Sequence, residues 1–377
     1  MTRCGLYIHI PFCSTKCPYC DFYSVTDRQD VLSGYGTLIG QELLLHLTSD
    51  WPFRTVDTIY FGGGTPSLLT PEAIAGMIKI VTAEMDVLDE VEISMEANPG
   101  TLTADKLAGY HEAGINRLSL GVQSFQMDLL RQLGRNHTLE DSVESIGLAR
   151  ASGFTNLSLD LIYNIPGQTQ KQWIHDLEMV RALEPEHVSA YTLTVEGDTP
   201  LHRAVLQSIV TLPSESEDLQ FFRLTHEKLP RMGLGSYEVS NFAREGYQCR
   251  HNLHYWRQEP YLGLGPSAHS FDGNMRWWNG RDLGNYQNQI HHQLLPVKGR
   301  EKLTATQQFN ERLLNGLRLS EGADLSALSQ WLPSDFDQWL EGACARWSQI
   351  QICNNRLVIS PEGMALTDSI TADLFSS

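Results

Sequence analysis

The first two thirds of the chain alternate short β-rich runs with amphipathic helical stretches, and this alternation limits the folds open to it. The expected strands are 6–10, 58–61, 91–96, 117–121, 157–162 and 188–193. The expected helices among them are 31–47, 71–84, 103–112, 141–151 and 170–183. Strands that alternate with helices form parallel sheets joined by right-handed crossovers. The pattern therefore predicts an α/β fold, either a doubly wound sheet or a complete or partial (β/α) barrel.

Polar or glycine-rich groups accompany five consecutive strands. The first strand leads into a cysteine-rich loop and the second into the glycine run 62–64, while the next three carry or precede Glu96, Gln123 and Asp160. In parallel α/β folds the carboxyl ends of the strands share one face, where ligands bind. This convergence favours a partial (β/α) barrel of about six βα units over residues 1–212.

Beyond the barrel the pattern changes twice. Residues 213–300 form an aromatic-rich segment that we expect to pack on the barrel. Residues 301–377 combine helices with a hairpin at 350–359, which turns at Asn354 and Asn355 and is followed by a last helix. The order helix, hairpin, helix predicts a winged-helix-like C-terminal module.

The charge and the cysteine content limit the partners and the cellular compartment that we expect for the chain. With 28 Lys and Arg against 45 Asp and Glu, the formal charge is −17, which disfavours nucleic acid and anionic lipid as partners. The chain has no run of 18 apolar residues, and its first apolar run is too short for a signal peptide. Seven cysteines, three of them within eight positions, indicate a metal site rather than a disulfide framework. We expect a cytoplasmic protein without a membrane span.

The three clustered cysteines follow the first strand with the spacing Cys13-x3-Cys17-x2-Cys20. Thiolates are the natural ligands of iron–sulfur clusters, and three of them leave one iron of a [4Fe–4S] cluster open. An amine and a carboxylate, such as S-adenosylmethionine offers, can occupy that iron. A zinc site with Cys4, His9 or a distant residue as fourth ligand is the alternative, although a second short cysteine or histidine knuckle is missing.

The same loop resembles the signature of the radical S-adenosylmethionine superfamily, with Tyr19 before its last cysteine. Further motifs in the same order resemble the oxygen-independent coproporphyrinogen III oxidase family. These motifs are Tyr7-Ile-His-Ile-Pro-Phe-Cys13, Gly62-Gly-Gly-Thr-Pro-Ser67, Glu96-Ala-Asn-Pro-Gly100, Arg117-Leu-Ser-Leu-Gly-Val-Gln-Ser-Phe125 and Asp160-Leu-Ile-Tyr-Asn-Ile-Pro166. The resemblance covers most of the first two thirds of the chain.

The resemblance assigns two groups of residues to S-adenosylmethionine. It implies that Tyr7, Gly63 and Glu96 contact the molecule bound at the cluster. In the oxidase branch a second molecule is bound at the positions of Tyr19, Gly64, Thr65, Gln123, Arg135 and Asp160. Taken one at a time, each has an ordinary structural interpretation, such as a tight turn for the glycines or a satisfied loop polar group for the others. Their shared position at the strand ends is the reason to treat them as a set.

Two departures from the oxidases point to the related heme-chaperone branch. The oxidases have a further cysteine two residues after the third, where this chain has Phe22, and an N-terminal extension, whereas six residues precede Tyr7 here. Three hypotheses follow: a heme-binding and delivery protein, a coproporphyrinogen III oxidase that decarboxylates propionates, or a barrel held by structural zinc. The first implies heme, recipient hemoproteins such as membrane respiratory enzymes, an electron donor and a homodimer as partners.

The segment from Cys249 to Trp256 resembles the heme-binding signature proposed for that branch. Imidazole and thiolate are both axial ligands of heme, and aromatic rings can cover the macrocycle. His251 is the first candidate ligand, followed by His254 and Cys249. The alternative is a polar and aromatic packing segment without a ligand.

Overall fold

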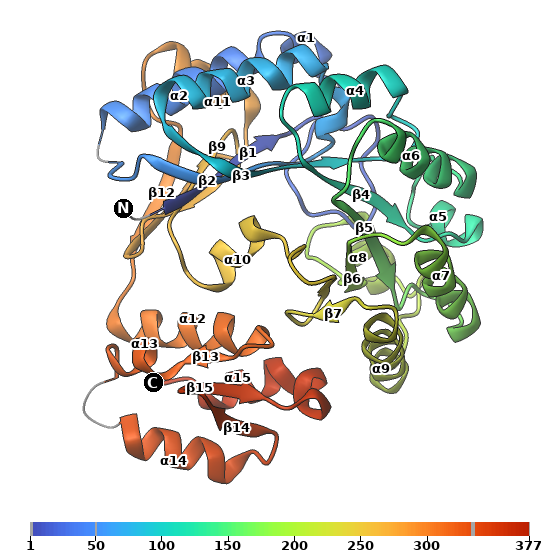
Figure 1. The fold of residues 1–377 in the computed structure, drawn as a ribbon, viewed down its shortest axis with the longest axis vertical. Helices are drawn as coiled ribbons and strands as arrows, with labels where there is room; N and C mark the ends of the chain where they lie inside the picture. The colour runs from blue at the N-terminus through green and yellow to red at the C-terminus, as the bar shows by residue number, and fades with distance from the viewer. Residues whose placement is uncertain (1–2, 50, 333–335, 377) are drawn as a thin grey trace.

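The computed structural model describes residues 3–49, 51–332 and 336–376, and its centre is a curved sheet of twelve strands (Figure 1). Six strands run parallel and lie side by side in sequence order, as the alternation predicted. They are β1 (Arg3–Ile10), β2 (Thr55–Gly63), β3 (Asp86–Ala97), β4 (Arg117–Gln123), β5 (Leu157–Tyr163) and β6 (His187–Thr192). Within the described residues the end strands β7 and β12 do not pair with each other, so the barrel is partial.

Helices cover the outer face of these strands (Figure 1). The larger ones are α2 (Tyr35–Thr48), α3 (Pro71–Glu84), α4 (Ala104–Glu112), α6 (Leu139–Ala151), α7 (Gln170–Leu183) and α9 (Glu215–Arg231), and the shorter ones are α5 (Met127–Gln132) and α8 (Pro200–Leu206). A threonine or serine side chain caps the N-terminus of α3, α4, α6, α7 and α9, satisfying a backbone N–H that the helix leaves free. The helix predicted at 31–47 is wrong in one respect: Ser33 and Gly34 divide it into α1 (Gln29–Leu32) and α2.

The aromatic-rich segment does more than pack on the barrel, because it lengthens the sheet at both edges. At one edge β8 (Asn241–Ala243) pairs with β6, and β7 (Gly235–Ser236) pairs with β8. At the other edge β9 (Tyr261–Leu264) pairs in parallel with β1. The edge continues through β10 (His269–Phe271), β11 (Met275–Asn279) and β12 (Val297–Lys302), with α11 (Leu283–His291) between the last two. Between the two edges α10 (Arg250–Trp256) crosses on the inner side of the sheet, against β1 and β2 (Figure 1).

Two buried side chains connect helices of the outer layer to elements distant in sequence. On α2, the fully buried carboxylate of Glu42 accepts hydrogen bonds from Gly265 N at 2.7 Å, Asn279 Nδ2 at 2.6 Å and Tyr286 Oη at 2.6 Å. On α7, the fully buried indole of Trp173 donates to Thr225 Oγ1 of α9 at 3.0 Å. Each links a helix of the outer layer to an element distant in sequence.

The C-terminal module has its own hydrophobic core and lies apart from the outer helices (Figure 1). It contains α12 (Ala305–Arg318), α13 (Leu325–Ser329), α14 (Phe336–Arg346), α15 (Thr367–Leu374) and a sheet of β13 (Ala323–Asp324), β14 (Ile350–Cys353) and β15 (Arg356–Ile359). Asn354 and Asn355 turn the hairpin with φ values of 48° and 61°, a conformation that asparagine tolerates. The predicted order of helices, hairpin and final helix is confirmed. In the described parts of the chain no helix is both long and apolar enough to cross a membrane.

Candidate functional site

The cysteine loop and the glycine run after β2 dock on each other through their backbones. Gly64 N donates to Ile10 O and Thr65 N donates to Phe12 O, both at 2.8 Å. A side chain at Gly64 does not fit, because an added Cβ would lie 2.7 Å from Phe12 O and 2.8 Å from Ile10 O. The glycine is required by this close approach, so the loop that carries the cysteines is positioned by β2 as well as by β1.

The three cysteines are half-buried free thiols on that loop. Thr65 Oγ1 donates to Cys13 Sγ at 3.6 Å, and Arg135 Nη1 donates to Cys17 Sγ at 3.7 Å. Burial, together with the neighbouring thiols of Cys17 and Cys13, raises the pKa of Cys20. Among the described residues no three His, Cys, Asp or Glu side chains are placed to hold a single metal ion, so the three thiols as they stand do not form a mononuclear metal site.

Asn98 links the two donors into one network that the sequence analysis did not identify. Arg135 Nη2 donates to Asn98 Oδ1 at 2.6 Å, and Asn98 Nδ2 donates to Thr65 Oγ1 at 3.1 Å. Hydrogen bonds to sulfur are one of the means by which proteins tune iron–sulfur clusters. The network therefore fits a thiolate-ligated cluster on Cys13 and Cys17, and the motif Glu96-Ala-Asn98 was the available signal for it.

The fourth ligands considered for a zinc site are occupied elsewhere. Cys4 is fully buried near the start of β1, the opposite end from the cysteine loop, and its thiol lies 3.5 Å from Thr55 O. His9 Nε2 lies 2.9 Å from Tyr23 O, which can only accept, so Nε2 carries the proton. Its Nδ1, 3.0 Å from Tyr7 Oη, then accepts from the phenol. Neither residue turns a free ligand atom toward the three cysteines.

Tyr7, Gly63 and Glu96 lie together on the first three strands. Glu96 Oε2 accepts from Gly63 N at 3.0 Å, and Oε1 accepts from Tyr60 Oη at 3.0 Å. A Cβ on Gly62 would lie 3.0 Å from Glu96 Oε1 and 3.1 Å from Tyr7 Cε2. Burial, with a smaller contribution from Asp160, raises the pKa of Glu96 to about 7. Such a carboxylate gains from a bound cation or from further hydrogen-bond donors, which an amine or ribose hydroxyls would supply.

Two of the residues expected at a second S-adenosylmethionine, Gln123 and Arg135, lie against Gly121. A Cβ added there would lie 2.9 Å from Gln123 Nε2 and 3.1 Å from Arg135 Nη2. Gln123 has a φ of 64°, a left-handed conformation that costs free energy in a non-glycine residue and is concentrated at functional sites. Tyr19 lies against the same region, and burial raises its pKa beside the Cys17 thiol. Gln123, Arg135 and Tyr19 therefore lie next to the cysteine loop.

Asp160 lies deeper in the barrel, on β5. It accepts from Ser119 Oγ at 3.0 Å and from Ser158 Oγ at 3.2 Å, and burial raises its pKa. The serines satisfy this carboxylate within the protein. Its negative charge acts on the site through Glu96, whose pKa it helps to raise.

The candidate heme residues lie on or next to α10, and the His251 ring stacks on Tyr60, whose hydroxyl donates to Glu96. His251 is 1% exposed and both of its ring nitrogens are engaged, Nδ1 with Thr58 Oγ1 and Nε2 with Tyr255 Oη, each at 2.8 Å. Burial lowers its pKa well below the usual value, so the ring is neutral. In this conformation an iron could bind His251 only if one of these hydrogen bonds broke.

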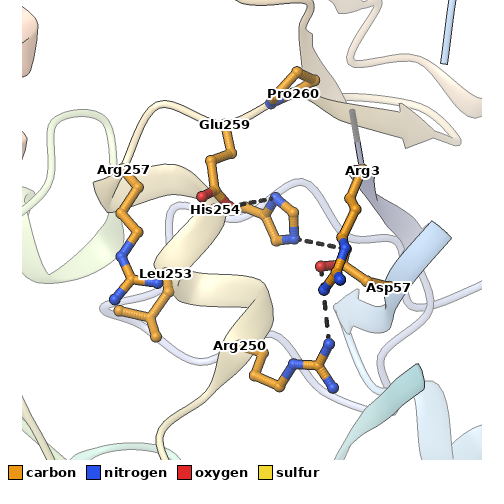
Figure 2. A pocket seen from close by; sticks show the side chains of 8 residues that line it. All are labelled: Arg3, Asp57, Arg250, Leu253, His254, Arg257, Glu259 and Pro260. Atoms are coloured by element: carbon orange, nitrogen blue, oxygen red, sulfur yellow. Dashed lines mark hydrogen bonds and ion pairs between the residues drawn. The ribbon is translucent and has the colours of Figure 1, made fainter. Parts of the chain in front are cut away.

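Cys249 and His254 differ in their surroundings. Cys249 is fully buried at the start of α10, where Glu92 accepts from the backbone N–H groups of Arg250 and His251 at 3.1 and 3.2 Å. Glu92, which the sequence analysis did not single out, thus holds the N-terminus of α10 against β3. Of the three candidates, only His254 lines the surface pocket drawn in Figure 2.

Comparisons with known proteins agree with this arrangement. The radical SAM superfamily matches residues 7–205, and the HemN C-terminal domain matches residues 303–366. Among solved structures, the coproporphyrinogen III oxidase HemN of Escherichia coli, a radical SAM enzyme, has a TM-score of 0.83 at 24% identity. The match covers 100% of this chain and 90% of that one, which shows a shared fold.

Curated relatives define the family more narrowly. The heme chaperone HemW of Bacillus subtilis is 35% identical over 317 residues, which cover 84% of this chain and 83% of the relative. HemW of Escherichia coli K12 is 37% identical over 325 residues, covering 85% and 83%. HemW of Mycobacterium tuberculosis H37Rv is 35% identical over 376 residues, covering 98% and 94%. The chain therefore belongs to the HemW family of the radical SAM superfamily.

Proposed function

We propose that this protein is a heme chaperone, which binds heme and delivers it to hemoproteins, and that it contains a [4Fe–4S] cluster and S-adenosylmethionine. The observation that carries the proposal is the similarity to heme chaperones named HemW over 83 to 94% of their lengths. The match to the Mycobacterium tuberculosis relative covers 98% of this chain and therefore includes the cysteine loop, the barrel and the C-terminal module.

Cys13, Cys17 and Cys20 would hold the cluster in this proposal, and Tyr7, Gly63 and Glu96 would contact the nucleotide at its open iron. When bound, the two cofactors supply one-electron chemistry at the sulfonium. The protein's own residues position them: Arg135 and Thr65 orient two of the thiols, while Glu96 offers a buried carboxylate to the amino group or the ribose. Gln123, Arg135, Tyr19, Gly64, Thr65 and Asp160 would line a second nucleotide position.

The cellular location that follows from this proposal is the cytoplasm. Recipient hemoproteins, among them membrane respiratory enzymes, would accept the heme, and an electron donor would reduce the cluster. A homodimer is the proposed assembly. The oxidase alternative predicts a different reaction, since it requires coproporphyrinogen III to lose two carboxyl groups.

Three measurements on the anaerobically reconstituted protein test the proposal. Iron analysis is expected to give about four irons per chain, with a reduced-cluster EPR signal that changes when S-adenosylmethionine is added. A hemin titration followed by absorbance is expected to saturate at a fixed stoichiometry. Incubation with coproporphyrinogen III and a reductant is expected to give no protoporphyrinogen IX.

The outcomes separate the hypotheses. Zinc in place of iron would refute the cluster, and efficient conversion of coproporphyrinogen III would replace the chaperone with the oxidase. Failure to bind hemin would remove the proposed function even if the cluster assembled normally.

A further inference from the structure

A surface pocket of about 350 Å³ lies at the end of the barrel opposite the cysteine loop. Its lining residues are Arg3, Asp57, Arg250, Leu253, His254, Arg257, Glu259 and Pro260 (Figure 2). Arg3 begins β1 and the cysteine loop follows its last residue, Ile10, so a strand of eight residues, or roughly 23 Å, separates the two sites. The pocket is thus distinct from the candidate cluster site.

Three guanidinium groups border the pocket in a chain whose formal charge is −17. Arg250 Nη1 donates to Glu90 O at 2.6 Å, and Arg257 Nε pairs with Glu321 Oε1 at 3.2 Å. The guanidinium of Arg3 makes no hydrogen bond or ion pair with any residue in 3–49, 51–332 or 336–376. An unpaired guanidinium next to two others is a carboxylate-binding arrangement, because its planar fork matches the two oxygens of that group.

Two carboxylates, Asp57 and Glu259, also line the pocket, so its three guanidinium groups leave a formal excess of one positive charge in the lining. His254 lies between them, with Nε2 2.9 Å from Asp57 Oδ1 and Nδ1 3.2 Å from Glu259 Oε2 (Figure 2). Asp57 Oδ2 is 3.8 Å from Arg250 Nη2. Asp57 is therefore engaged by groups of the pocket wall, while Glu259 only lies beside the His254 ring and Arg3 stays available to a ligand.

We infer that this pocket binds the two propionate groups of heme through Arg3 and Arg257, an inference that rests on the proposed function. Heme is a flat apolar ring with two carboxylates on one edge, and the pocket offers cations beside the apolar surfaces of Leu253 and Pro260. A volume of about 350 Å³ is at the low end for ligand pockets, which suits the propionate edge rather than the whole ring. The site also borders α10, the segment that resembles the heme signature.

Hemin titrations of the full-length protein test this assignment. The variants are Arg3→Gln and Arg257→Gln, each of which removes one charge, with Arg231→Gln as the matched control because Arg231 is an exposed residue of α9 paired with Glu227. Each charged hydrogen bond to a carboxylate is worth enough to weaken binding about tenfold when it is lost. We expect that loss for both pocket variants, no change for the control, and weaker binding of hemin dimethyl ester to the wild type. Thermal unfolding of each variant checks that it is folded.

Each outcome has a distinct meaning. If the wild type binds hemin but both pocket variants bind it as tightly, the pocket assignment is refuted while the proposed function stands. Equal affinity for hemin and its dimethyl ester would refute it as well, because the ester carries no propionate charge. Binding of succinate that requires Arg3 but leaves the hemin affinity unchanged would assign the pocket to free dicarboxylates instead. No hemin binding by the wild type would refute the proposed function and this inference together.

Discussion

The contact between the glycine run and the cysteine loop allows the stability loss of a Gly64→Ala variant to be worked out from the structure. In Gly64→Ala the new Cβ would lie 2.7 Å from Phe12 O, whereas ordinary contacts begin at 3.4 Å, so the two loops must move apart by about 0.7 Å. Such a shift lengthens the hydrogen bonds Gly64 N–Ile10 O and Thr65 N–Phe12 O from 2.8 Å beyond the usual limit. At about 1 kcal/mol each, their loss lowers the free energy of unfolding by about 2 kcal/mol.

The matched control is Gly76→Ala. Gly76 is exposed on α3, and an added Cβ would have no heavy atom within 4 Å. Alanine at this helical position is expected to raise the free energy of unfolding by about 0.5–1 kcal/mol.

Denaturant unfolding of the two variants measures these changes, and iron analysis after reconstitution measures the effect on the cluster. Gly64→Ala is expected to retain less iron than the wild type, because its cysteine loop is displaced, while Gly76→Ala keeps the full amount. The reasoning is wrong if Gly64→Ala matches the wild type in both iron content and unfolding free energy.

Three further predictions concern other parts of the molecule. Arg135→Gln removes the donor to Cys17 Sγ and is expected to shift the midpoint potential of the cluster, measured by redox titration; an unchanged potential would refute the link. Burial raises the pKa of Glu42 to about 7, so the folded state holds a proton that the unfolded chain releases above its ordinary value of 4.5. The contribution of Glu42 to the free energy of unfolding should therefore be greatest below pH 4.5 and fall by on the order of 3 kcal/mol as the pH rises to 7. In Glu42→Gln the melting temperature should depend less on pH than in the wild type, and an unchanged pH dependence would contradict this. Trp173→Ala should cost about 3–5 kcal/mol in urea unfolding because it empties a buried site; a loss below 1 kcal/mol would contradict it.

The parallel core of the fold could be predicted from the sequence because each of its strands is a local apolar run bounded by a turn. All six strands predicted for the barrel are present, and α3 and α7 have the predicted bounds. The strands β9 and β10 were not predicted, since they are four and three residues long and contain too few residues for an alternating pattern. The pairing of β9 with β1 joins segments about 250 residues apart, and no local signal reports such a pairing.

The candidate site, too, has parts that the sequence predicts and parts that only the fold reveals. The spacing of the cysteines and the glycine run marks the loops, because these residue types are needed at fixed positions along the chain. The hydrogen bonds that join Arg135, Asn98 and Thr65 depend on three loops meeting in space, so the sequence names the residues without showing the network. The aromatic composition of α10 likewise does not reveal that His251 is buried against β2, where its ring is hydrogen-bonded to Thr58.

The pairing of β9 with β1 has a consequence for any attempt to work with the barrel alone. Residues 7–205 match the superfamily, yet β1 lacks its second neighbour until residues Tyr261–Leu264 have been added. A fragment ending near residue 212 would expose the backbone of β1 as an open edge, which is a template for aggregation. During translation the strand that leads into the cysteines would stay uncovered until more than two thirds of the protein had been made, which makes this interval the period of greatest risk for misassembly.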